Sequence, residues 1–186
     1  MARPWKTLAQ VPTSEGTLEL RQRGDAEFLI TIAGRILMTS QARRSEESLS
    51  TLALAAVKAK SPRVLIGGLG MAYTVRAALD VLPPTASVVV AELHKEVAEW
   101  CRGPLAPLTA GSVLDPRVKV EIGDVAKIIT RAPVGKLDGA RLPEGSQAHR
   151  LVQRLILVHM EPPRATEVAG GQHGRYAADE EQECDG

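Results

Sequence analysis

The feature that most constrains this chain is a short apolar run that ends in a cluster of glycines, Val64-Leu-Ile-Gly67-Gly68-Leu-Gly70. Glycine lets the backbone turn sharply and approach a ligand closely. The residues that follow have helical spacing, and the first turn of a helix presents unpaired N–H groups to a ligand. A strand, a glycine turn and a helix in this order are typical of α/β proteins that bind a ligand at the carboxyl ends of parallel strands.

The glycine turn belongs to a longer series in which short apolar runs alternate with helical ones. Strands and helices are predicted in turn at residues 64–66, 72–82, 88–91, 95–102, 118–122 and 125–129. The short connections between them favour βαβ units and a parallel sheet. Three strands are few for an open sheet of this kind, so we predict an α/β fold with an incomplete parallel sheet.

A different pattern precedes this series. Apolar and polar residues alternate in three short runs separated by Gly24 and Gly34, at residues 17–23, 27–33 and 35–39. This alternation predicts a small antiparallel β-meander. The sequence Ser45-Glu46-Glu47 then has the composition of a helix N-terminus, with Ser45 as the N-cap, and the helix is predicted to run to about Lys60.

From Pro133 onward the alternation of strands and helices stops. One further apolar run, at residues 151–158, is surrounded by Gly, Pro, Arg, Gln and acidic residues. The composition after about Pro162 is typical of disorder. We therefore predict three parts: a meander at 1–44, a partial ligand-binding α/β domain at 45–133, and an atypical segment at 134–186 with a disordered tail.

Composition narrows the function. The formal net charge is +1 and aromatic residues make up 3% of the chain, which argues against a general nucleic-acid-binding or membrane-binding surface. The two cysteines and four histidines have no metal-ligand spacing, so we expect no metal. No apolar run of about 18 residues is present. We expect a cytoplasmic protein whose partner is a small molecule.

Acidic residues follow the second and third predicted strands. Glu92 lies 22 positions after Gly70, where a carboxylate can accept hydrogen bonds from both hydroxyls of a ribose. Gly123-Asp124 ends the next strand, where a carboxylate can meet an adenine amine. The pattern predicts a nucleoside site at the carboxyl ends of three strands. Ordinary roles stay open as well: tight packing for the glycine turn, and helix capping for Glu92 and Asp124.

The same crevice binds nicotinamide dinucleotides in other proteins, and one residue argues against them here. Their fingerprint is G-x-G-x-x-G/A, whose third small residue lets the helix and the strand pack closely. Counting from Gly68 and Gly70, that third position holds Tyr73. A ligand without pyrophosphate fits better, and an NAD(P)-binding oxidoreductase stays as a third hypothesis.

A resemblance to a known family is carried by three stretches, which are Val64 to Ala72, Ala91 to Arg102, and Asp115 to Asp124. In this order they resemble motifs of the class I S-adenosylmethionine-dependent methyltransferase fold superfamily, and within it the spermidine synthase-like (polyamine aminopropyltransferase-like) group. The likeness extends over about residues 17–130. It implies a Rossmann-like fold preceded by a β-meander, a homodimer, S-adenosylmethionine or its decarboxylated form as ligand, and aminopropyl or methyl transfer as the reaction.

The same resemblance implies roles for individual residues. The glycines of the turn would contact the amino-acid or aminopropyl end of the ligand, Glu92 would hold its ribose, and Gly123 with Asp124 would bind its adenine. Gln41 is similar to a Gln that the family carries ahead of its first long helix. The implied ligand-binding set is Gly67, Gly68, Gly70, Gln41, Glu92, Leu93, Gly123 and Asp124.

The chain also departs from the family's pattern. Leu69 to Ala72 stand where the family has Gly-Asp-Gly-Gly, Ser50-Thr51 replace a Tyr-His pair, and no apolar strand leading to an Asp follows Leu137-Asp138. We therefore predict that the chain leaves the pattern near Gly135, and we assign no catalytic residue. A second hypothesis follows: a non-catalytic remnant of the fold, or an interaction protein that dimerises.

Overall fold

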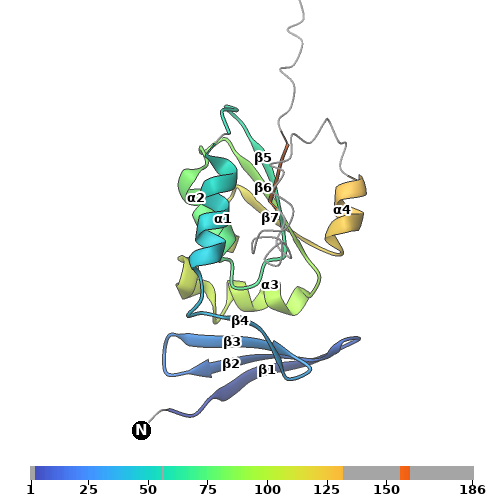
Figure 1. The fold of residues 1–186 in the computed structure, drawn as a ribbon. Helices are drawn as coiled ribbons and strands as arrows, with labels where there is room; N and C mark the ends of the chain where they lie inside the picture. The colour runs from blue at the N-terminus through green and yellow to red at the C-terminus, as the bar shows by residue number, and fades with distance from the viewer. Residues whose placement is uncertain (1–2, 56, 132–155, 160–186) are drawn as a thin grey trace, which may run out of the picture.

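The computed structural model describes residues 3–55, 57–131 and 156–159. They form two four-stranded sheets that share one hydrophobic core. Figure 1 shows the first sheet beneath the second, with helix α3 (Lys95–Arg102) between them. Within these residues, no helix has the length and apolar content that a membrane span requires.

The first sheet is the predicted meander with one additional strand. Its strands run antiparallel in chain order and are β1 (Lys6–Thr13), β2 (Gly16–Arg23), β3 (Glu27–Ile32) and β4 (Arg35–Thr39). The sequence pattern misses β1, since this strand is mostly exposed and contains Pro12, which an edge strand tolerates. Six apolar side chains are buried on the meander: Leu18, Leu20, Phe28, Ile30, Ile32 and Met38.

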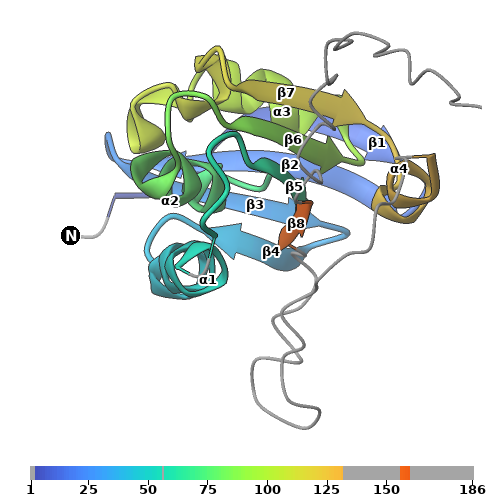
Figure 2. The same cartoon turned by 90° about the horizontal axis from the view of Figure 1, so that it is seen from above.

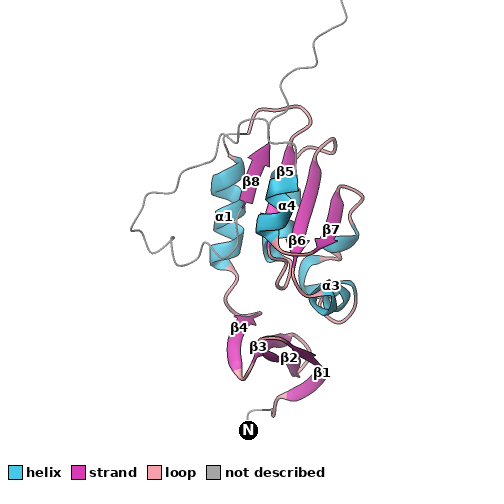
Figure 3. Cartoon of the chain, turned by 90° about the vertical axis from the view of Figure 1, so that its right-hand side faces the viewer, coloured by secondary structure: helices cyan, strands magenta, loops and turns pink. Residues whose placement is uncertain are grey.

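The second sheet contains the predicted parallel strands. They are β5 (Arg63–Gly67), β6 (Ser87–Glu92) and β7 (Val118–Ile122), in the order β7-β6-β5. Alternate residues of β5 and β6 are 0–2% exposed: Val64, Ile66, Val88 and Val90. Figures 1 and 2 show helix α2 (Tyr73–Val81) on one side of this sheet and α4 (Val125–Arg131) on the other, and Figure 3 looks at the sheet from the α4 side. The predicted three-stranded parallel sheet is confirmed.

A fourth strand, β8 (Ile156–His159), occupies the other side of β5 and runs antiparallel to it. Ile156 pairs with Ile66 and His159 with Arg63, so β8 begins at the edge of the sheet where β5 ends. The apolar run at 151–158 thus contributes a strand whose direction the sequence pattern did not predict. The predictions of a departure near Gly135 and of a disordered tail concern residues 132–155 and 160–186, which lie outside the described residues.

Helix α1 (Arg44–Leu54) begins and ends at residues other than those predicted. Its N-cap is Arg43, which makes no side-chain capping bond, and Ser45 lies inside the first turn. A hydroxyl inside the helix cannot take the N-cap position, so the prediction of Ser45 as N-cap was wrong. The helix also ends at Leu54, before the predicted Lys60.

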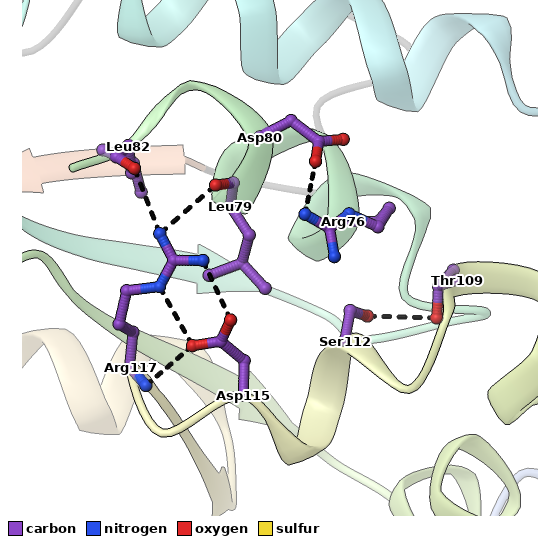
Figure 4. Close-up of polar contacts among 8 residues, drawn as sticks. All are labelled: Arg76, Leu79, Asp80, Leu82, Thr109, Ser112, Asp115 and Arg117. Atoms are coloured by element: carbon purple, nitrogen blue, oxygen red, sulfur yellow. Dashed lines mark hydrogen bonds and ion pairs between the residues drawn. The ribbon is translucent and has the colours of Figure 1, made fainter. Parts of the chain in front are cut away.

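Arg117, which lies just before β7, fixes the C-terminal end of α2. Its Nη1 donates to the carbonyl oxygens of Leu79 (3.2 Å) and Leu82 (3.0 Å), which close this end of the helix. The Asp115 carboxylate holds the same guanidinium through Nε (2.9 Å) and Nη2 (2.8 Å), as Figure 4 shows. Asp115 and Arg117 begin the stretch Asp115 to Asp124 that resembles a family motif. They lie at the amino ends of the strands, and their contacts stabilise the fold.

We expect Arg117→Met to lower the free energy of unfolding by about 2 kcal/mol, because it removes several hydrogen bonds made by a charged group. Urea unfolding measures the loss. Arg76→Met is the control, since Arg76 forms a partly exposed ion pair with Asp80 one helical turn away, worth at most about 0.5 kcal/mol. Equal losses in the two variants would contradict the capping role of Arg117.

The same pair predicts a pH dependence. The hydrogen bond from Arg117 lowers the pKa of Asp115 from 3.8 to about 2. Because the folded-state pKa is depressed, this stabilisation is complete above pH 3.8 and is lost as the pH falls toward 2. We expect the free energy of unfolding of wild-type protein to fall by about 2 kcal/mol over this range. Arg117→Met should not show this fall, because it lacks the guanidinium that lowers the pKa of Asp115. Denaturant unfolding of both proteins at several pH values measures the difference, and parallel curves would refute it.

Candidate functional site

The carboxyl ends of the three parallel strands are held in line by backbone hydrogen bonds. Beyond the strand ladders, the Gly68 N–H donates to the Ala91 carbonyl (2.7 Å) and the Gly123 N–H donates to the Glu92 carbonyl (2.8 Å). The structure thus brings Gly67 and Gly68, Glu92, and Gly123 to one edge of the sheet, as the sequence predicts. We call this the carboxyl edge.

Glu92 has a structural role at this edge. Its side chain is buried, and Oε2 accepts a hydrogen bond from the Leu69 N–H (2.7 Å) while Oε1 accepts one from the His94 N–H (2.9 Å). His94 is the N-cap of α3, so one carboxylate joins the glycine turn to the start of that helix. A carboxylate has about four acceptor sites, and two of them remain for the hydroxyls of a ribose.

Asp124 caps the helix that follows it. Its Oδ1 accepts a hydrogen bond from the Ala126 N–H (2.7 Å) at the start of α4, which is the N-cap role that the sequence left open. The side chain is exposed, and this bond uses only one of its two oxygens. Capping and recognition of an adenine amine are therefore compatible at this residue.

The glycine turn is a tight structure held by its buried side chains. Gly68 and Gly70 have φ values of +83° and +53°, which favour glycine, and the Ala72 N–H donates to the Leu69 carbonyl at 2.9 Å. Leu69 and Met71 are both 0% exposed. Helix α2 follows, with Ala72 as its N-cap. No capping side chain accepts a hydrogen bond from the N–H groups of its first turn.

Two exposed apolar side chains flank the carboxylates. Leu93 follows Glu92 and is 54% exposed, and Ile122 precedes Gly123 and is 53% exposed. Large apolar side chains at this exposure, at the ends of adjacent strands, suit contact with a flat base. Leu93 belongs to the set that the resemblance implies and Ile122 does not, because the only sequence signal for Ile122 is its position before Gly-Asp at a strand end.

Gln41 takes no part in the hydrogen bonds that align the carboxyl edge. It is exposed in the turn between β4 and α1, and its backbone N–H donates to Thr39 Oγ1 at 3.4 Å. Its implied place in the ligand-binding set stays a prediction.

A separate hollow of about 380 Å³ lies between α1 and α2. It is lined by charged side chains that pair with each other: Arg43 with Glu47 at 3.4 Å, and Arg76 with Asp80, which Figure 4 shows. Because these charges are paired along their own helices, the hollow offers a ligand little. In the described part of the chain, no three His, Cys, Asp or Glu side chains gather as metal ligands.

Comparisons with known proteins bear on the fold. No protein-family profile and no curated protein matches the chain. Solved structures that resemble it include spermidine synthase from Thermotoga maritima, with a TM-score of 0.56 and 19% identity over 67% of this chain. A spermidine synthase in complex with the transition-state analogue AdoDATO matches with the same values. The chain spans 43% of each of these proteins, and the likeness shows a spermidine synthase-like fold in part of their length.

We expect Glu92→Ala to lower the free energy of unfolding by about 3 kcal/mol, because it leaves the N–H groups of Leu69 and His94 without their acceptor. Urea unfolding measures the loss. Glu96→Ala, in the first turn of the same helix, is the control and should cost at most about 1 kcal/mol through the helix dipole. A loss no larger than that of the control would show that the Glu92 carboxylate does not hold the edge together.

Proposed function

We propose that this chain binds S-adenosylmethionine or its decarboxylated form at the carboxyl edge of β5, β6 and β7. The observation that carries the proposal is the alignment of the glycine turn, Glu92 and Asp124 on three adjacent strands. Glu92 accepts hydrogen bonds from the ribose hydroxyls, and Asp124 accepts one from the adenine amine. Leu93 and Ile122 contact the base. The glycine turn and the start of α2 receive the amino-acid or aminopropyl end.

The charges of the edge support a cationic nucleoside rather than a nucleotide. The strand ends contribute two carboxylates, Glu92 and Asp124, and no Lys or Arg occurs within residues 67–70, 91–94 or 122–124. Carboxylates attract a sulfonium and repel phosphate. Tyr73, which is 3% exposed, fills the position that a dinucleotide site reserves for a small residue. The Tyr73 position argues against the NAD(P)-dependent alternative.

The reaction that fits the fold is transfer of an aminopropyl or methyl group from the sulfonium. An amine with a free electron pair attacks the carbon next to sulfur, the new C–N bond forms as the C–S bond breaks, and the amine loses a proton. In aminopropyl transfer the neutral thioether methylthioadenosine leaves. Such a displacement depends mainly on positioning the two reactants. We assign no catalytic residue among those described.

A second candidate is nucleoside binding without transfer, and the direction of β8 favours it. In the described chain, the strand beside β5 is antiparallel, so it ends at the opposite edge of the sheet from Glu92. Glu92 and Asp124 reach the carboxyl edge because each lies at the end of a parallel strand. An antiparallel strand ends at the other edge, so β8 cannot place an acid there in the same way. Release of methylthioadenosine from decarboxylated S-adenosylmethionine and a diamine would favour transfer, and binding without release would favour this second candidate.

Asp124 offers the cleanest test of binding. We expect Asp124→Asn to keep the helix cap, with stability within about 0.5 kcal/mol of wild type, because Asn is as good an N-cap as Asp. Its affinity for methylthioadenosine should fall more than about tenfold, because the acceptor for the adenine amine becomes a donor. Wild-type protein should also reject the hypoxanthine analogue, and the Asn variant should discriminate less.

Isothermal titration calorimetry measures these affinities, and urea unfolding supplies the stability control. Asp124→Ala is the matched variant that loses both the cap and the recognition group. A folded wild-type protein that binds none of S-adenosylmethionine, its decarboxylated form and methylthioadenosine would overturn the proposal. Enhanced NAD(P)H fluorescence on mixing would point instead to the oxidoreductase hypothesis.

A further inference from the structure

One peptide group in the glycine turn lies between two sulfur atoms. The Met71 N–H donates to Met38 Sδ (3.2 Å), and the Gly70 carbonyl accepts a hydrogen bond from Cys101 Sγ (3.1 Å). Met38 belongs to β4 of the meander and Cys101 to α3. All three side chains that surround this peptide group, Met38, Met71 and Cys101, are at most 6% exposed.

This peptide group joins the two central residues of a turn, Gly70 and Met71. It is the central peptide of the four-residue turn that the Ala72 N–H closes onto the Leu69 carbonyl. Gly70 has a positive φ and Met71 does not, which is the φ pattern of a type II′ turn. Types I′ and II′ differ by rotation of this central peptide plane, and the rotated form would give Met71 a positive φ. Contacts that fix this plane therefore determine the directions of the Gly70 carbonyl and the Met71 N–H.

The two sulfur atoms differ in whether they can donate a hydrogen bond. A thioether has no hydrogen to donate, so Met38 can hold an N–H but offers nothing to a carbonyl oxygen. A thiol can donate weakly, which suits the Gly70 carbonyl. If the plane turned over, the carbonyl would face the thioether and lose its partner. The pair therefore stabilises one orientation.

We propose that Met38 and Cys101 are positioning residues of the nucleoside site, because their sulfur atoms fix the Gly70–Met71 peptide plane and with it the glycine turn. This inference rests on the proposed function. It assigns the meander a part in ligand affinity through Met38, in addition to its share of the hydrophobic core.

The test uses the full chain and two measurements: hydrogen exchange of the Met71 amide by NMR, and calorimetric affinity for methylthioadenosine. Met38→Leu keeps the side-chain volume and removes the acceptor. We expect exchange of the Met71 amide to accelerate about tenfold and affinity to fall about fivefold. Cys101→Ala should weaken binding similarly, and Cys101→Ser, which restores a donor, should stay within about twofold of wild type.

Ile30→Val is the matched control, because Ile30 lies opposite Met38 on β3 and is buried to a similar degree. It should reduce stability without changing Met71 exchange or affinity. Unchanged exchange and affinity in Met38→Leu would overturn the inference, as would faster exchange with unchanged affinity. If wild-type protein binds no nucleoside, the proposed function fails with the ligand part of this inference, and Met71 exchange still decides whether the sulfur atoms hold the turn.

Discussion

The Glu92 carboxylate is the interaction on which the carboxyl edge depends. It accepts hydrogen bonds from the glycine turn after β5 and from the N-cap of α3, while the backbone carbonyl of the same residue receives the Gly123 N–H from β7. One residue thus connects three elements that are far apart in the sequence. A buried carboxylate is stable only where such donors surround it, so the turn and the acid position each other.

The places of Glu92 and Asp124 at the ends of parallel strands were predictable from the sequence, and their contacts were not. Continuous apolar runs predict buried parallel strands, and an acid at a strand end follows from that topology; α3 and β7 even have the predicted bounds. That Glu92 binds two backbone N–H groups depends on turn geometry, which no pattern encodes. The contacts of Met38 and Cys101 with the turn span 33 and 31 residues, beyond any local signal.

Other differences have the same physical origin. An apolar run indicates burial but carries no direction, so the antiparallel orientation of β8 could not be predicted from residues 151–158. β1 lies at a sheet edge and needs little apolar content, since its stability comes from backbone pairing with β2. Ser45 has the composition of an N-cap, but α1 begins one residue before it.

Binding and transfer have separate structural requirements in this fold. The groups that would recognise a nucleoside lie on β5, β6 and β7, which pair in parallel and share backbone bonds at the carboxyl edge. A group that deprotonates or orients an acceptor must instead reach the transferred carbon from beside the ligand. On the side of β5, the described chain presents the beginning of β8 rather than the end of a parallel strand. The groups proposed to bind a nucleoside and the groups that transfer would require therefore belong to different parts of this sheet.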